Sequence, residues 1–123
     1  MFVLDCSMTM AWAFHDERTP GTLDALELAA LEACVAPGVW PLEVCNAVLT
    51  AQRRGRFTSE DVPRFLALVG GLRVSVEESS LQHTFDDVLP LAMHHALSSY
   101  DAAYLELALR TNCLLYTSDA ADE

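Results

Sequence analysis

The sequence predicts an α/β fold of three layers, in which helices cover both faces of a central parallel sheet of about four strands. Short apolar segments alternate with longer segments whose apolar residues recur at helical spacing. The short segments are apolar on both faces, as strands enclosed between two helix layers are. The 123 residues contain no internal repeat and no low-complexity linker, so we expect one domain over residues 1–123.

The first part of the chain predicts the order strand, helix, helix, strand. Asp5 or Ser7 can supply the side-chain cap of the first helix, and Pro37-Gly38 stops the second strand at a turn. The expected elements are a strand at Phe2–Asp5, a helix that reaches about Phe14, a helix at Thr22–Ala33 and a strand at Cys34–Ala36.

The second part predicts four further helices and two further strands. Pro41 suits the first turn of a helix, whereas Pro90 should end or kink its helix locally. Ser98 can cap the last helix. The expected elements are helices from Pro41 to Arg54, from the cap at Thr58–Asp61 to about Val69, at Leu81–Ala96 and at Ser99–Thr111, with strands at Leu72–Val76 and Cys113–Thr117. In the first of these helices, Leu42, Cys45, Val48 and Leu49 form an apolar stripe.

The charge balance excludes several mechanisms. Eighteen acids stand against seven bases, the net charge is -11, and every base is an arginine. Without lysine the chain cannot form a lysine Schiff base or a P-loop phosphate site. Such an acidic surface repels nucleic acid at long range, so binding RNA requires a bridging cation, a local arginine patch or a basic partner.

The location is expected to be the cytoplasm. No basic leader precedes Asp5, and the longest segment without charged residues, Val88–Tyr100, is too short to span a bilayer. The four cysteines are far apart and form no C-x-x-C pair. They are expected to be small core residues in a reducing compartment.

Four acids stand beside apolar or small residues, where a solvated charge is less expected. They are Asp5, Glu43, Asp101 and Asp119. In a parallel sheet, sites form beyond the carboxyl ends of the strands, and these acids follow strands or open helices near that edge. Two like charges about 4 Å apart repel by about 4 kcal/mol at an effective dielectric of 20, so such a cluster favours a hard divalent cation, Mg²⁺ or Mn²⁺.

Each acid also has a structural interpretation. Asp5 can act only as a helix cap, and Glu43 only as a favourable anion in a first turn. Asp101, three residues after Ser98, can complete a capping box. Asp119 can be a terminal acid without a role. Spacing alone does not decide between these interpretations and a metal site.

Three segments favour the metal site, because they resemble the main blocks of PIN-domain ribonucleases, in particular the VapC-type toxins of toxin–antitoxin pairs. The blocks are FVLDCS from Phe2, WPLEVCNAV from Trp40 and LSSYDAAYLELA from Leu97. The resemblance implies a PIN-like fold and a Mg²⁺- or Mn²⁺-dependent endoribonuclease of the cytoplasm, which forms a homodimer and is inhibited by a small antitoxin protein. It makes Asp5, Glu43 and Asp101 the metal-binding and catalytic carboxylates. Ser7 and Asn46 are expected to support these carboxylates by hydrogen bonding.

The C-terminal run carries a further expectation. Thr117-Ser118-Asp119 matches a fourth block of the family, which makes Asp119 another metal ligand and Thr117 its supporting hydroxyl. Family members continue beyond this point, and residues 113–123 also resemble translated sequencing adapter. We therefore expect a C-terminally truncated chain.

Arg53, Arg54 and Arg56 form the basic cluster of the sequence. One interpretation is that they are solvated cations at a helix end, and the other is that they contact RNA or a partner.

The alternative function, of another class, is a PIN-like binding module without catalysis that sequesters RNA or an antitoxin. Metal-dependent RNA cleavage that Asp5→Asn abolishes distinguishes the two. Receiver domains and haloacid-dehalogenase-type phosphatases call for a lysine that this chain lacks.

Overall fold

The computed structural model, which describes residues 1–116, contains a parallel four-stranded sheet with the order β3-β2-β1-β4. The strands are β1 (Phe2–Leu4), β2 (Cys34–Pro37), β3 (Val74–Glu77) and β4 (Leu114–Tyr116). Phe2 pairs with Cys34 on one side and with Leu114 on the other. Strand β1 is therefore central, and Asp5 follows it directly at the carboxyl edge of the sheet.

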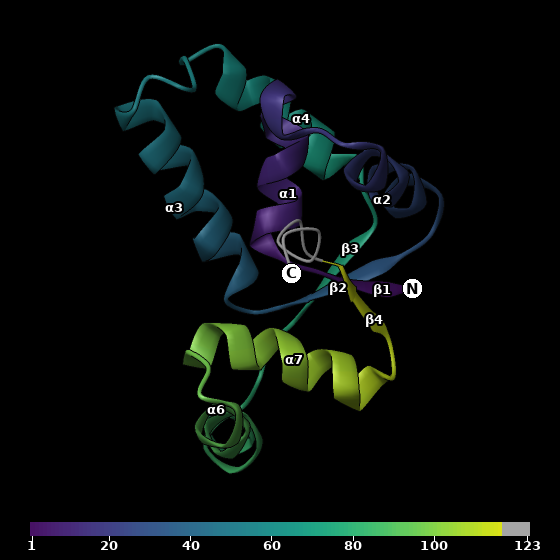
Figure 1. Cartoon of the computed structure of the whole chain (residues 1–123), viewed down its shortest axis with the longest axis vertical. Coiled ribbons are helices and arrows are strands. Elements are labelled where there is room, and N and C mark those ends of the chain that lie inside the picture. Colours follow the sequence, from purple (N-terminus) through teal and green to yellow (C-terminus); the bar gives the residue numbers. More distant parts are fainter. Residues whose placement is uncertain (117–123) are drawn as a thin grey trace.

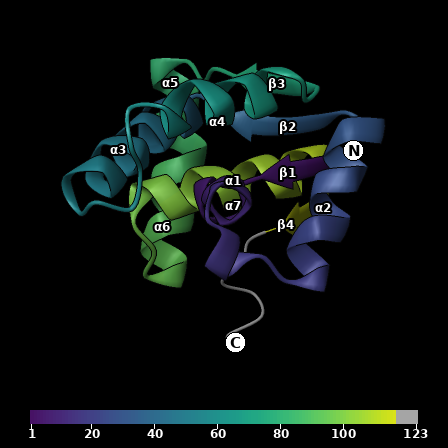
Figure 2. The ribbon, with the colours of Figure 1, turned by 90° about the horizontal axis from the view of Figure 1, so that it is seen from above.

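Helices cover both faces of this sheet. Figure 1 shows α1 to α4 on one side of the strands and α6 and α7 on the other, and Figure 2 shows the same layers from above. The longer helices are α1 (Cys6–Ala13), α2 (Pro20–Leu31), α3 (Trp40–Arg53), α4 (Asp61–Gly70), α6 (Leu89–His95) and α7 (Ser99–Thr111). The predicted three-layer α/β fold is confirmed.

Two helices differ from the sequence prediction for local reasons. Helix α2 begins at Pro20 rather than Thr22, because the Thr19 and Thr22 side chains cap each other's backbone N–H groups. The helix expected over Leu81–Ala96 is divided into α5 (Leu81–His83), a π-helical turn over Thr84–Val88, and α6. The π turn lies immediately before the first turn of α6, which accommodates Pro90.

The core lies between the sheet and both helix layers. Val3, Leu4 and Trp12 are fully buried, and the Trp12 indole N–H donates to the Thr22 carbonyl at 2.7 Å. Trp40 is also buried. Both tryptophans are thus core residues whose indole groups have partners, and neither presents its ring to solvent for stacking.

The apolar stripe expected on α3 is buried only in part. Val44, Val48 and Ala51 are buried, whereas Leu42 is 74% exposed and Leu49 is 50% exposed. Cys45 is exposed with them, while Cys34 is the one fully buried thiol among four free cysteines of the described chain. The helix therefore has apolar residues on two faces, of which the chain covers one.

None of the helices between residues 1 and 116 combines the length and the apolar character that a bilayer crossing requires.

Candidate active site

Asp5 lies where β1 ends and α1 begins, and its carboxylate is held there by the chain around it. It caps α1 by accepting the Met8 backbone N–H at 2.9 Å. The Ser7 hydroxyl lies 2.9 and 3.0 Å from the two Asp5 carboxylate oxygens, to which it can donate. The residue is half-buried. Asp5 is therefore both the predicted cap and an oriented carboxylate at the edge of the sheet, with Ser7 beside it as expected.

Glu43 reaches the same region from the first turn of α3, after β2. Its carboxylate accepts a hydrogen bond of 2.6 Å from the Tyr104 hydroxyl of α7. The start of α3 is fixed against α1, because the buried Trp40 indole N–H donates to the Thr9 hydroxyl at 3.0 Å. Thr9 in turn donates to the Asp5 carbonyl at 2.9 Å. This chain of contacts joins the helices that carry Asp5 and Glu43.

The carboxylates of Asp5 and Glu43 both raise the pKa of two neighbouring groups, Cys6 and Tyr104. Burial, together with the negative charges of Glu43 and Asp5, raises the pKa of the Cys6 thiol to about 12. Burial, the hydrogen bond to Glu43 and the charges of Glu43 and Asp5 also raise the pKa of the Tyr104 hydroxyl well above its usual value. Cys6 and Tyr104 therefore stay neutral at pH 7, and the potential around them is negative, which favours a bound cation.

Asp101 lies in the first turn of α7, three residues before Tyr104 and so on the same side of the helix. Its backbone N–H receives the cap from the Ser98 hydroxyl at 3.0 Å. The reciprocal half of a capping box is absent among the described residues, because the Asp101 carboxylate makes no hydrogen bond there. The side chain is exposed and open to a ligand.

The donor groups fit a hard divalent cation in kind, since all are carboxylate oxygens on the carboxyl edge of the sheet. Asp5 and Glu43 share the neighbourhood of Cys6 and Tyr104, but Asp101 is not among the charges that act on these two groups. Over residues 1–116, no three His, Cys, Asp or Glu side chains are close enough together to hold one metal ion. The geometry thus brings Asp5 and Glu43 to the same neighbours. Asp101, the third predicted ligand, lies one helical turn before Tyr104 on α7.

The remaining predicted residues stand apart from this pair. Asn46 lies on α3 one turn after Glu43, is exposed, and forms no side-chain hydrogen bond with the described part of the chain. Thr117 and Asp119 lie outside the described residues.

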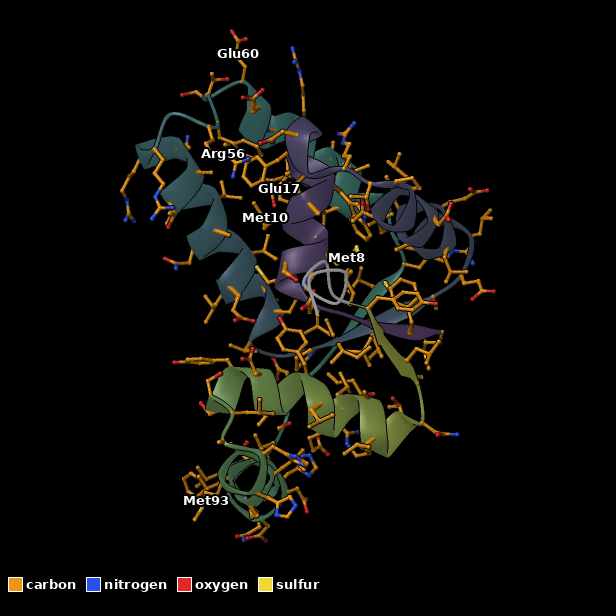
Figure 3. All side chains as sticks on the ribbon, in the orientation of Figure 1. Met8, Met10, Glu17, Arg56, Glu60 and Met93 are labelled. Atoms are coloured by element: carbon orange, nitrogen blue, oxygen red, sulfur yellow. The ribbon has the colours of Figure 1, made fainter. Side chains whose placement is uncertain are left out.

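The basic cluster divides into two kinds of arginine. Arg56 pairs with Asp16 at 3.0 Å and with Glu17 at 2.9 Å, and its guanidinium lies 3.8 Å from the centre of the Phe14 ring. Figure 3 shows Glu17 and Arg56 beside each other at the far end of α1. Arg53 and Arg54 are exposed and pair with no acid of the described chain. Arg56 therefore has a structural role, and Arg53 and Arg54 are available to a ligand.

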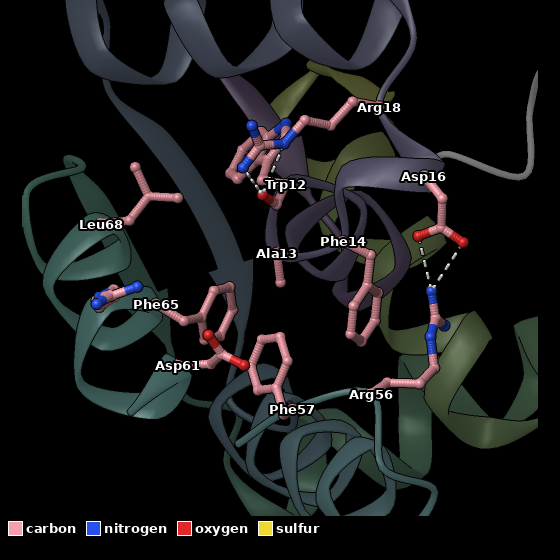
Figure 4. Close-up of a pocket in the computed structure, with 11 residues that line it drawn as sticks. Trp12, Ala13, Phe14, Asp16, Arg18, Arg56, Phe57, Asp61, Phe65 and Leu68 are labelled. Carbon is pink, nitrogen blue, oxygen red and sulfur yellow. Dashed lines mark hydrogen bonds and ion pairs between the residues drawn. The ribbon is translucent and has the colours of Figure 1, made fainter. Parts of the chain in front are cut away.

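Arg56 also borders an aromatic pocket of about 380 Å³ between the end of α1 and α4 (Figure 4). Phe14, Phe57 and Phe65 form its wall, with ring centres 5.2 and 5.9 Å apart in successive pairs. The Arg18 guanidinium closes another side by donating to the Trp12 carbonyl at 2.8 Å. This pocket lies at the opposite end of α1 from Asp5, so it is separate from the carboxylates.

Two features near the carboxyl edge of the sheet were not predicted from the sequence. One is Tyr104, whose spacing of three from Asp101 indicates a shared helix face but not its bond to Glu43. The other is a second pocket, of about 420 Å³, at the carboxyl ends of β2 and β3. Its residues are distant in sequence, and no motif marks them.

No protein-family model matches the chain. It is 29% identical over 119 residues to Ribonuclease VapC9 of Mycobacterium tuberculosis and to VapC ribonuclease Mb0985 of Mycobacterium bovis, which covers 97% of this chain and 86% of each relative.

Two solved structures share the fold. A protein of Pyrobaculum aerophilum, PAE2754, superposes with a TM-score of 0.69 and 23% identity over 94% of this chain and 72% of its own. A toxin–antitoxin complex from Klebsiella pneumoniae superposes with a TM-score of 0.60 and 15% identity, which covers 94% of this chain and 83% of the matched chain. The resemblance to VapC ribonucleases that the three sequence blocks indicated is therefore confirmed over nearly the whole chain.

Proposed function

We propose that this homologue of VapC ribonucleases is the toxin of a toxin–antitoxin pair and a metal-dependent endoribonuclease that hydrolyses RNA phosphodiester bonds. The homology supports the reaction class. The observation that carries the proposal onto these residues is the position of Asp5 and Glu43. Their elements are joined through the contacts of Thr9 with the Asp5 carbonyl and with Trp40, and both charges raise the pKa of Cys6 and of Tyr104. This negative edge of the sheet suits a cation-assisted reaction on an anionic substrate.

The proposed metal ligands are Asp5, Glu43 and Asp101, with Asp119 as a fourth. Bound Mg²⁺ or Mn²⁺ supplies Lewis-acid activation of water and neutralises charge on the phosphate. The chain's own residues orient the carboxylates: Ser7 lies within hydrogen-bonding distance of both Asp5 oxygens, and Tyr104 donates to Glu43. Asn46, one turn after Glu43 on α3, is proposed to support the same carboxylate.

Arg53 and Arg54 are the proposed phosphate contacts. Glu43 stands near the beginning of α3 and Arg53 at its end, ten residues on, or about 15 Å along the helix axis. A single RNA strand that follows α3 from the carboxylates can therefore bring a phosphate two or three nucleotides away to these arginines. Elsewhere the net charge of -11 opposes RNA, so this contact sets the direction of the strand.

The proposed partners are a cognate antitoxin and a second copy of the chain, in the cytoplasm. The structural likeness to a toxin–antitoxin complex supports the first, and a basic antitoxin segment suits the carboxylate edge. The uncovered apolar face of α3, with Leu42, Cys45 and Leu49, supports the second.

The test of the nuclease is RNA cleavage by the purified chain with Mn²⁺, with Mg²⁺ and with EDTA. We expect cleavage that EDTA abolishes and that Asp5→Asn reduces to the level without enzyme. Asparagine also caps helices well, so this variant should fold. Asp24→Asn, an exposed acid on α2, is the matched control and should cleave normally. Tight binding of RNA or antitoxin without metal-dependent cleavage contradicts the nuclease and supports a binding module.

A further inference from the structure

The second pocket lies between the segment that precedes α3 and the start of α7, the two helices that carry Glu43 and Asp101. It is bounded by the ends of β2 and β3, the π-helical turn and the start of α7, and has a volume of about 420 Å³. Val39, in its wall, precedes α3 and accepts the backbone N–H of Glu43 at 3.0 Å. Tyr100, also in its wall, is the residue before Asp101. The backbone on two sides of the pocket therefore continues directly into the first turns that carry Glu43 and Asp101.

The lining of this pocket combines an apolar floor with polar groups at its rim. Val39, Val88 and Ala103 supply the apolar surface, and the Tyr100 side chain is 58% exposed beside it. At the rim, the Glu78 carboxylate and the Ser79 and Ser99 hydroxyls form no hydrogen bond or ion pair with other residues of the range 1–116.

The residues that line the pocket suit the base of a nucleotide better than its phosphate. No arginine contributes to this wall, and Glu78 repels phosphate, so the pocket does not suit the RNA backbone. An unpaired base has a flat face that can stack on a tyrosine ring and an edge of N–H groups that can donate to a carboxylate. The π-helical turn over Thr84–Val88 forms part of the wall, and such turns recur at functional sites.

We propose that this pocket binds the base of the nucleotide next to the cleaved phosphodiester, with Tyr100 stacking on the base and Glu78 accepting its N–H groups. The inference rests on the proposed nuclease function and adds a specificity-determining site to it. Because a carboxylate accepts two adjacent donors at once, the pocket favours guanine, whose N1–H and amino group lie side by side, over uracil.

The binding test uses the full chain carrying Asp5→Asn, so that RNA is not consumed, and short fluorescent oligoribonucleotides that differ in one base. We expect an added Tyr100→Ala to weaken binding about tenfold, the scale of one lost base stack. Added Glu78→Gln should remove the preference for guanine over uracil. The matched controls, Phe85→Ala on the π-helical turn and Glu60→Gln before α4, are exposed residues outside the pocket and should bind like the parent.

Cut-site mapping on the chain with an intact Asp5 provides the second readout. Cleavage by the parent chain, with cut sites and oligonucleotide affinities unchanged in Tyr100→Ala and Glu78→Gln, overturns the base pocket and leaves the nuclease standing. Absence of cleavage by the parent chain, together with base-dependent binding that Tyr100→Ala weakens, supports the pocket and overturns the nuclease. The two proposals therefore fail separately.

Discussion

The Tyr104 hydroxyl donates a hydrogen bond of 2.6 Å to the Glu43 carboxylate, across 61 positions of sequence. The contact joins α7, which covers one face of the sheet, to the first turn of α3, which covers the other (Figure 1). Burial and the charges of Glu43 and Asp5 raise the pKa of Tyr104, so its hydroxyl keeps the proton that it donates. Tyr104 is therefore the residue that fixes the orientation of Glu43.

Tyr104→Phe tests this contact. Removing the hydroxyl leaves the half-buried Glu43 carboxylate without its donor, and we expect a loss of about 1 to 2 kcal/mol in the free energy of unfolding. RNA cleavage should fall about tenfold, since Glu43 is then free to rotate. Urea unfolding and initial cleavage rates measure the two effects. Tyr116→Phe, whose ring packs on Phe2, is the matched control. Parent-like values in both measurements would contradict the role given to Tyr104.

The buried thiol of Cys34 predicts how stability depends on pH. Burial raises its pKa from 9.0 to about 11, so above pH 9 the unfolded chain loses this proton while the folded chain keeps it. The unfolded state then binds fewer protons, and stability present below pH 9 is lost as the pH rises to 11, by on the order of 1 to 3 kcal/mol.

Urea midpoints from pH 8 to 11 measure this loss. Cys34→Ala should reduce the slope, and Cys45→Ala, at an exposed position, should keep it. If the urea midpoint of Cys34→Ala falls with pH as steeply as that of the parent, the pH dependence comes from other groups.

The sequence predicted most elements because each has a local cause. Ser98 begins α7 where it was expected, with its hydroxyl capping Asp101, and Asp5 ends β1 as a cap. Asp5 and Glu43 were also expected near one another, because the carboxyl ends of parallel strands share an edge. What failed locally was α2, whose start depends on a threonine pair that hydrophobic periodicity does not reveal.

The site was less predictable than the sheet because its contacts join distant segments. The bond between Tyr104 and Glu43 depends on how α7 packs, which no spacing along the chain encodes. The burial of α3 was predicted only in part, for a related reason. Leu42 and Leu49 form as regular an apolar stripe as Val44 and Val48 do, and periodicity does not say which stripe the chain itself covers.

The uncovered face of α3 predicts the oligomeric state. If it is the surface between two copies, Leu42→Glu should bury a charge in the interface and convert the dimer to a monomer. Sedimentation velocity at micromolar concentration measures the change. Leu66→Glu, a substitution on α4 at a residue that is 54% exposed, is the matched control and should leave the dimer intact. A parent chain that sediments as a monomer would remove the dimer proposal.

The two kinds of arginine in the basic cluster should respond differently to mutation. Arg56→Ala removes two ion pairs and the contact with the Phe14 ring, so we expect it to lower the free energy of unfolding by about 1 kcal/mol. Arg53→Gln with Arg54→Gln should leave stability unchanged and weaken RNA binding.

Because each contact to single-stranded RNA contributes about 0.7 to the dependence of log affinity on log salt, the double variant should lower that slope by about 1.4. Binding is measured by fluorescence polarisation from 50 to 200 mM salt, in the Asp5→Asn chain. Arg73→Gln, which alters an exposed arginine immediately before β3, is the charge-matched control. An equal slope for the double variant and the parent would mean that RNA does not follow α3, and the strand would then have to leave the carboxylates in another direction.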